Sequence, residues 1–169
     1  MNVLETERLL IRQFNTEDAD FILELLNDPS FIKNIGDRNV RTLEDAQAYL
    51  RKGPMTSYEK NGFGLSPVIL KETGESIGMC GLIKRDALEN VDIGYAFLPR
   101  YWAKGYAVES ALGMKAYAKD VVGLKKLVGI VDPANKESIR VLEKIGLTYE
   151  KMIRLPEDSI DLKLFSMDL

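Results

Sequence analysis

Residues 97–108 read FLPRYWAKGYAV, and in this stretch an apolar strand meets a long helix through a short turn. Gly105 precedes the helix, and Ala107 places only a small side chain in its first turn. The first amides of a helix have no intrahelical acceptor and carry about half a positive charge. A turn that leaves them uncovered is an anion site, and Gly105 would let a phosphate approach the backbone. A plain tight turn beside two solvated cations, Arg100 and Lys104, fits the pattern equally well.

The composition excludes several kinds of chemistry. The chain has 169 residues and no histidine, which removes an imidazole base, a Ser-His-Asp relay and a histidine-rich metal site. Its one cysteine, Cys80, lies in an apolar strand, and we interpret it as a core residue instead of a nucleophile. We therefore expect no metal and a reducing, cytoplasmic location. Neither a dinucleotide fingerprint nor a P-loop motif occurs at a strand-to-helix turn.

The charge balance argues against two classes of partner. Lys and Arg number 23 against 26 Asp and Glu, so the formal charge is -3, the wrong sign for a dedicated nucleic-acid binder. No window approaches the roughly 18 apolar residues that span a bilayer, so we expect no membrane association. With 46% hydrophobic residues, the chain can bury one sizeable core.

Hydrophobic periodicity on both sides of the turn predicts one α/β domain over residues 1–169, with a mixed sheet. Thr42 to Asp45 has the spacing of a capping box, and Asp28-Pro29 and Gly53-Pro54 each stop a helix. The expected elements are strand 8–14, helices 16–28 and 42–53, strands 64–71, 76–85 and 91–97, helix 105–119, strand 126–131, helix 138–145, and strands 147–154 and 160–167.

Four segments in this order resemble the GNAT superfamily of acetyl-CoA-dependent N-acetyltransferases, in the branch that contains ribosomal-protein N-terminal acetyltransferases. They are TERLLIRQF (6–14), GESIGMCGLI (74–83), IGYAFLPRYWAKGYA (93–107) and DPANKESIRVLEKIGL (132–147). The resemblance covers nearly the whole chain. It implies a mostly antiparallel central sheet, flanked by about four helices and splayed between strands 91–97 and 126–131, with acetyl-CoA as co-substrate.

The resemblance assigns the cofactor's pyrophosphate to the turn quoted above. The family motif Q/R-x-x-G-x-G/A here begins with Trp102, a departure common in the resembled branch. Because the family's contacts are mostly backbone N–H groups, we expect the substitution to be tolerated. Glu109, in the first turn of the helix, is interpreted as complementing the helix dipole. The implied pyrophosphate-binding residues are Ala103, Lys104, Gly105, Tyr106, Ala107 and Val108.

Two further cofactor contacts follow from the resemblance. The strand edge at Tyr95, Ala96 and Phe97 would pair with the amides of pantetheine, as an added strand does. Asn135 matches a family asparagine that hydrogen-bonds the same arm of the cofactor. A plain helix-capping role is the alternative for Asn135, because a helix begins just after it.

The catalytic groups are less clearly marked. An amine attacks a thioester only when unprotonated, so a base must take its proton, and Asp92 on strand 91–97 is the candidate. An ordinary strand-end carboxylate or a water chain are the alternatives. The tyrosine that often protonates the thiolate in the family is replaced by Leu142. Ser138 is the hydroxyl nearest the expected sulfur, where it would donate a hydrogen bond, or it would merely satisfy the first helical turn.

The acceptor is the least defined partner. It would lie over the loops around residues 31–38, between the first two helices. Our first hypothesis is acetyl transfer to a primary amine, with a protein N-terminal α-amine as one possibility. A small-molecule or antibiotic amine, or a non-catalytic sensor that binds acyl-CoA, are the alternatives. The sequence leaves the oligomeric state open.

Overall fold

The computed structural model describes residues 1–169 and contains one eight-stranded sheet with the order β1-β2-β3-β4-β5-β6-β8-β7. All neighbouring pairs are antiparallel except β5 and β6, which confirms the predicted mixed, mostly antiparallel sheet. The strands are β1 (Asn2–Glu5), β2 (Leu9–Arg12), β3 (Leu65–Leu70), β4 (Ser76–Ile83), β5 (Asp92–Phe97), β6 (Lys126–Val131), β7 (Thr148–Ile153) and β8 (Leu162–Asp168).

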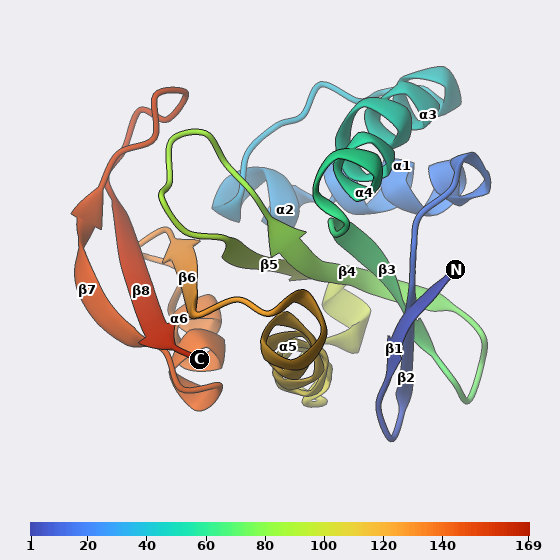
Figure 1. Cartoon of the computed structure of the whole chain (residues 1–169). Coiled ribbons are helices and arrows are strands. Elements are labelled where there is room, and N and C mark those ends of the chain that lie inside the picture. The colour runs from blue at the N-terminus through green and yellow to red at the C-terminus, as the bar shows by residue number, and fades with distance from the viewer.

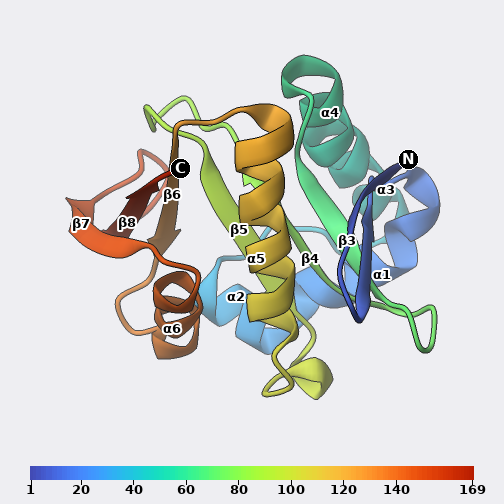
Figure 2. The ribbon, with the colours of Figure 1, turned by 60° about the horizontal axis from the view of Figure 1, so that its bottom comes forward.

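Helices cover both faces of this sheet (Figure 1). One core cluster joins α5 and α6 to the sheet, and a second joins α1, α2 and α3 to its other face. Figure 2 shows α5 crossing the sheet, with α6 beside it below β6. None of the helices is long and apolar enough to cross a bilayer. The helices are α1 (Ala19–Asn27), α2 (Pro29–Asn34), α3 (Leu43–Leu50), α4 (Thr56–Asn61), α5 (Tyr106–Tyr117) and α6 (Lys136–Lys144).

The structure departs from the predicted elements at both proline stops. Asp28 does end α1, but its carboxylate then accepts the Ser30 N–H at 2.9 Å and caps a new helix, α2, with Pro29 in the first turn. The chain also stays helical past Pro54, through a wider turn at Arg51–Met55 that leads into α4. Proline lacks an N–H, and a wider turn accommodates that missing donor.

The N-terminus holds one strand that the sequence analysis did not predict. β1 pairs with β2 in antiparallel fashion, with a bulge between Asn2 and Leu4. Its four residues, NVLE, include only two apolar side chains, which are neighbours, so hydrophobic periodicity does not reveal the strand. The connection between β1 and β2 carries Thr6 and Arg8 to the start of α5, where both make hydrogen bonds.

β5 and β6 separate soon after they begin. Their one paired position is Asp92 with Val128, and the Val128 N–H donates to the Val91 carbonyl at 3.1 Å. Beyond that point, the two strands no longer pair. This is the splay that the resemblance implied, and it leaves main-chain groups of β5 without a neighbouring strand.

Candidate functional site

The first turn of α5 has amides without a cap. Gly105 occupies the N-cap position in the left-handed region, with φ of 82°, and no side chain caps the helix. Glu109 is the first residue of the helix whose N–H finds an acceptor, the Gly105 carbonyl at 3.0 Å. Ala103 also has a positive φ, 61°, and residues 103–105 are exposed. The six residues expected to bind pyrophosphate therefore form an exposed turn at 103–105 and the half-buried start of α5 at 106–108, and their main-chain N–H groups have no protein acceptor.

Trp102 ties this turn to the end of β5. Its indole N–H donates to the Phe97 carbonyl at 2.8 Å, while the side chain remains about half exposed. The residue at the first position of the motif thus holds the turn through its ring nitrogen. This contact accounts for tryptophan at a position where the family pattern has Gln or Arg.

Glu109 has a larger role than helix-dipole complementation. Its carboxylate accepts hydrogen bonds from Thr6 Oγ1 at 2.5 Å, from the Arg8 N–H at 2.9 Å and from Arg8 Nε at 2.6 Å. Burial alone would raise the pKa of Glu109, but these hydrogen bonds outweigh it and hold the pKa below its usual range. The sequence analysis missed Thr6 and Arg8, since the chain brings them to Glu109 from about a hundred residues away.

The main-chain groups of β5 alternate between its two neighbours. Leu98 N–H donates to the Ile77 carbonyl in the register that pairs Ala96 with Met79, so the Ala96 main chain faces β4. The main-chain groups of Tyr95 and Phe97 face the gap between β5 and β6. Of the three predicted pantetheine contacts, Tyr95 therefore has its main-chain groups at the gap and Phe97 its N–H, because the Phe97 carbonyl accepts the Trp102 indole. The Ala96 main chain is turned to β4, so a contact of Ala96 with pantetheine stays a prediction that this register does not favour.

Tyr95 and Ser138 meet through their side chains. Tyr95 Oη lies 3.0 Å from Ser138 Oγ and donates to the Ser138 carbonyl at 2.9 Å, so β5 contacts α6. Burial raises the pKa of Tyr95, partly opposed by the hydrogen bond to Ser138, so the phenol stays protonated at neutral pH. The sequence analysis assigned Tyr95 a main-chain role and gave no sign of this hydroxyl pair.

Asn135 caps α6, as the capping alternative predicted. Its Oδ1 accepts the Ser138 N–H at 3.3 Å, which leaves the Nδ2 amide free to donate elsewhere. Leu142, where the family often has tyrosine, is buried and packs toward Gly129 of β6. A leucine in the core supplies no proton, whereas Ser138 and Tyr95 bring a pair of hydroxyls together where β5 meets α6.

Asp92 lies at the point where β5 and β6 part. It is 1% exposed, and Arg85 Nε approaches its carboxylate at 3.3 Å. Burial raises the pKa of Asp92 to about 6, against the opposing effect of Arg85. Because side chains alternate along a strand, Asp92 and Tyr95 leave β5 on opposite faces. The structure thus separates Asp92 from Ser138, the two residues predicted to act together.

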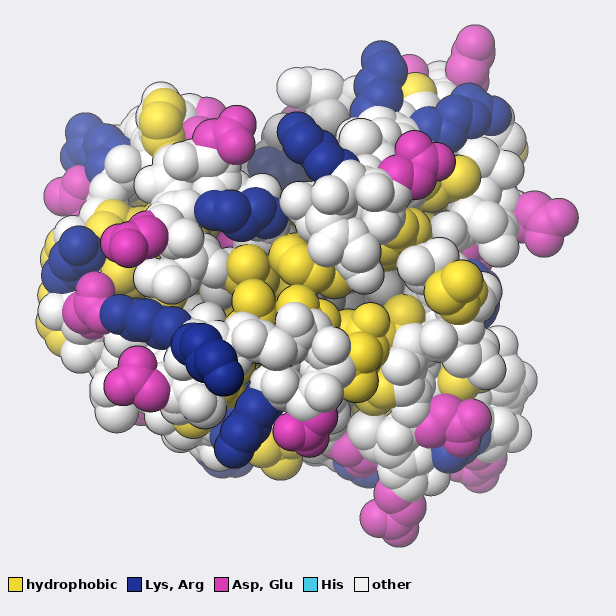
Figure 3. Space-filling model, in the orientation of Figure 1, with side chains coloured by type: hydrophobic (Ala, Val, Ile, Leu, Met, Phe, Trp, Pro, Cys, Tyr) yellow, Lys and Arg dark blue, Asp and Glu magenta, His cyan; other side chains and the backbone are white.

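A surface recess lies on the side of the sheet that carries α3. It has a volume of about 420 Å³. Figure 3 shows Lys and Arg side chains around the hollow between the β4–β5 connection and α3–α4. Of the stretch 31–38 where the acceptor was expected, Arg38 lines the recess, whereas Phe31 is buried in the second core cluster. The lining residues are Arg38, Asn39, Val40, Asp45, Ala48, Tyr49, Lys52 and Gly53.

Tyr49 lines this recess and is affected by the charge of Arg85. Burial raises the pKa of Tyr49, while the charges of Arg38 and Arg85 act in the opposite direction. Arg85 is also the residue that contacts Asp92. The charge of Arg85 therefore acts on both Tyr49 of the recess and Asp92.

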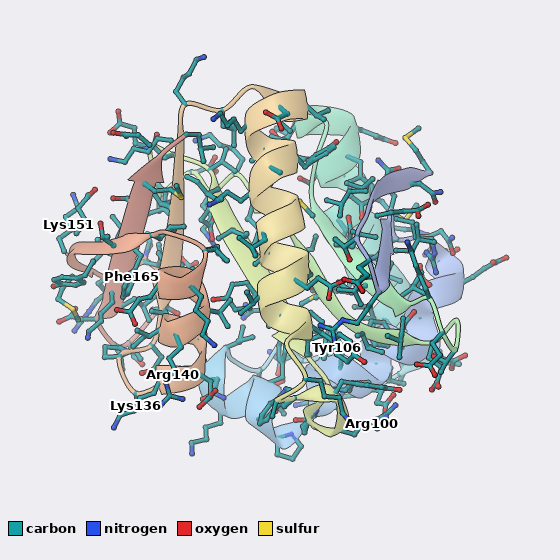
Figure 4. All side chains as sticks on the ribbon, turned by 90° about the horizontal axis from the view of Figure 1, so that it is seen from below. Arg100, Tyr106, Lys136, Arg140, Lys151 and Phe165 are labelled. Carbon is teal, nitrogen blue, oxygen red and sulfur yellow. The ribbon has the colours of Figure 1, made fainter.

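Basic residues also lie near the start of α5. Figure 4 shows Arg100 and Tyr106 at the same end of α5, with Lys136 and Arg140 on the neighbouring helix α6. Arg100 forms an ion pair with Glu24 at 3.0 Å, and Arg140 forms one with Glu137 at 2.6 Å.

Cys80 is fully buried in β4, and burial raises its pKa to about 12, so it remains a protonated core thiol. No group of three or more His, Cys, Asp or Glu side chains that could hold a metal ion occurs in residues 1–169.

Comparisons with known proteins give a consistent result. Residues 8–148 match a family model described as the acetyltransferase (GNAT) domain. An uncharacterized N-acetyltransferase of Bacillus subtilis, YnaD, is 34% identical over 147 residues, covering 87% of this chain and 83% of its own. A GNAT-family acetyltransferase structure from Bacillus anthracis has a TM-score of 0.82 at 28% identity, covering 99% of this chain and 98% of its own.

A more distant structure shares the fold. It is RimL, a ribosomal L7/L12 alpha-N-protein acetyltransferase in complex with coenzyme A. The TM-score is 0.86 at 13% identity, and the match covers 100% of this chain and 98% of the other. At that identity, the likeness concerns the fold alone.

Proposed function

Because this chain belongs to the GNAT family of acetyltransferases, we propose that it transfers the acetyl group of acetyl-CoA directly to a protein N-terminal α-amine. The observation that carries the proposal is the uncapped start of α5, next to the splayed edge of β5. A helix start of this kind binds phosphates, and a free strand edge binds the amides of an extended chain. Acetyl-CoA carries both groups next to each other, because its pantetheine arm is attached directly to the pyrophosphate.

Each candidate residue then has a defined task. The amides of residues 103–108 orient the pyrophosphate, and the main-chain groups of Tyr95, together with the Phe97 N–H, align the pantetheine arm, because the Phe97 carbonyl already accepts the Trp102 indole N–H. In the reaction the amine nitrogen forms a bond to the acetyl carbon, the carbon–sulfur bond breaks, and the amine loses a proton. Ser138 stabilises the departing thiolate by donating a hydrogen bond.

Asp92 is the proposed proton acceptor. With a pKa of about 6, its carboxylate is ionised at neutral pH and is more basic than an ordinary aspartate. Since Asp92 and Tyr95 leave β5 on opposite faces, the acid and base would work from the two sides of the splay. Water on the α3 side would carry the proton from the amine to the buried carboxylate.

The acceptor is proposed from the open recess beside α3. A recess of about 420 Å³ at the surface admits the end of an extended peptide. An α-amine, with a pKa near 8, is also easier to deprotonate than a lysine side chain, with a pKa of about 10.4. RimL, which shares the fold, is described as an alpha-N-protein acetyltransferase.

The test measures thiol release from acetyl-CoA with a matched panel of acceptors. Peptides with a free N-terminus, the same peptides with a blocked N-terminus, and small amines would be compared at equal concentration. We expect turnover with free peptide N-termini only. Turnover with small amines alone would favour a metabolite or antibiotic acceptor, and CoA binding without turnover on any acceptor would favour a sensor.

A further inference from the structure

Arg8 reaches the start of α5 from the far end of the sequence. Its Nε donates to Glu109 Oε1 at 2.6 Å, and its Nη1 donates to the Lys104 carbonyl at 2.9 Å. The guanidinium also lies over the Tyr106 ring, 4.5 Å from its centre. Three contacts therefore hold one side chain against the turn that would bind pyrophosphate.

One nitrogen of this guanidinium has no protein partner. Nη2 makes none of the hydrogen bonds of Arg8, and it lies 3.3 Å from the position that a Cβ on Gly105 would occupy. The Arg8 side chain is 41% exposed. A donor held rigidly beside an exposed glycine, with its other nitrogens already bonded, is directed at whatever approaches that glycine.

The charge of Glu109 makes this arrangement more than a structural clamp. Hydrogen bonds keep the pKa of Glu109 low, so its carboxylate is ionised in the first turn of α5. A negative charge there interacts favourably with the helix dipole, but it repels a phosphate bound at the same end of the helix. Arg8 neutralises that charge where the phosphates would approach.

We infer that Arg8 binds the pyrophosphate of acetyl-CoA, with Nη2 as a donor beside Gly105 and with the charge of Glu109 neutralised behind it. The inference rests on the proposed position of the cofactor at the start of α5. It adds to the main-chain turn a side chain supplied by the β1–β2 connection. The turn and the arginine together make a site with both backbone and charged donors.

The experiment measures the dissociation constant of CoA by calorimetry, using the full chain with Arg8→Met, Glu109→Gln and both substitutions together. We expect Arg8→Met to weaken binding by about tenfold, which corresponds to about 1.4 kcal/mol. The double variant should recover part of the lost affinity, because it also removes the unpaired carboxylate. If Arg8 only stabilised the fold, the double variant would bind CoA no more tightly than Arg8→Met.

A phosphate-free donor supplies a second readout. S-acetylpantetheine lacks the pyrophosphate, so its kcat/KM should be the same for the wild type and Arg8→Met, whereas that of acetyl-CoA should fall. Arg154→Met is the matched control, because it removes an exposed Arg–Asp pair with an Nε contact of 2.9 Å at a remote loop. It should leave both values unchanged.

The outcomes separate this assignment from the proposed function. Three results would overturn the role of Arg8 and leave the proposed function standing. They are wild-type affinity for CoA in Arg8→Met, an equal loss of kcat/KM with both acetyl donors, and no recovery of affinity in the double variant. A wild-type chain that binds no CoA would overturn the proposed function as well. If Arg8→Met does not fold, Arg8→Lys gives the same comparison, since lysine keeps the charge but loses the forked donors and should bind CoA severalfold more weakly.

Discussion

The starts of α3 and α5 satisfy their amides in opposite ways. At α3, Thr42 Oγ1 accepts the Asp45 N–H at 3.0 Å, and the Asp45 carboxylate accepts the Arg41 N–H at 3.0 Å. At α5, Gly105 offers no side chain. A capped start stabilises its own helix, whereas an uncapped and exposed one leaves its donors to a ligand. This difference is the reason that the cofactor site is proposed at the start of α5.

Gly105→Glu should have the largest effect on the uncapped start of α5. The new side chain would bring bulk and negative charge to the amides of α5, and its Cβ would lie 3.3 Å from Arg8 Nη2. We expect the dissociation constant of CoA to rise by about 100-fold or more, about 2.7 kcal/mol. Calorimetry with CoA checks this prediction.

Gly123→Glu is the matched control for that variant. Gly105 and Gly123 both have φ of 82°, so a side chain at either pays a similar strain of about 1–2 kcal/mol. Gly123 follows the last helical turn after α5, and nothing lies within 4 Å of its Cβ position. Equal loss of CoA binding in the two variants would mean that backbone strain, not the cradle, caused the effect.

Because the cofactor site is proposed at the start of α5, the proposed base should affect turnover without affecting CoA affinity. Asp92→Asn should lower kcat by about 100-fold, the lower end of the usual contribution of a general base. In the wild type, kcat/KM should fall as the pH drops through about 6, because protonated Asp92 no longer accepts a proton. This acid limb should disappear in the variant.

Stability distinguishes this effect from simple damage to the fold. The folded-state pKa of Asp92, about 6, lies above the value of 3.8 for an exposed aspartate. Stability from the protonated form is therefore complete below pH 3.8 and is lost as the pH rises through about 6. Asp92→Asn should melt at or above the wild-type temperature at pH 7. A large drop in Tm would contradict the assignment of the lost turnover to chemistry.

Local patterns explain how much of the fold the sequence could predict. The strand–turn–helix around Gly105 and the Thr42 cap depend on neighbouring residues, and the structure contains both. Helical continuation through Pro54 was missed because a wider turn accommodates the absent donor. The α2 cap at Asp28 was missed because Asp-Pro serves equally as a stop and as a start.

The candidate site was harder to predict, because its side-chain contacts join distant segments. Arg8 and Glu109 are 101 residues apart, and Tyr95 and Ser138 are 43 apart. No local spacing encodes such pairs, and an alternating strand gives no indication of which hydroxyl its side chain will meet. The pyrophosphate turn could be proposed from the sequence, since its expected contacts come from backbone amides of one continuous segment.

The start of α6 is intermediate between those of α3 and α5. Its cap, Asn135, is present, but Ser138 in the same first turn also contacts Tyr95. Ser138→Ala should lower kcat by about tenfold with little change in the KM of acetyl-CoA, because the alanine variant keeps the backbone cap and loses only the hydroxyl. Steady-state kinetics at saturating acceptor measure the two parameters.

Tyr95→Phe tests whether the hydroxyls act together. Removing the phenol leaves Ser138 Oγ without its partner at 3.0 Å, so kcat should fall, but by less than in Ser138→Ala. The double variant should be no slower than Ser138→Ala alone. Additive losses would show that the two hydroxyls act independently.

The smallest effect is expected at the capped helix. Thr42→Ala removes the oxygen that accepts the Asp45 N–H and should lower the free energy of unfolding by about 1 kcal/mol. Because this cap serves only α3, the affinity for CoA should stay within twofold of the wild type. Urea denaturation measures the first quantity and calorimetry the second. A loss of CoA affinity in Thr42→Ala would mean that the two helix starts are coupled, and the distinction between a capped structural end and an open binding end would fail.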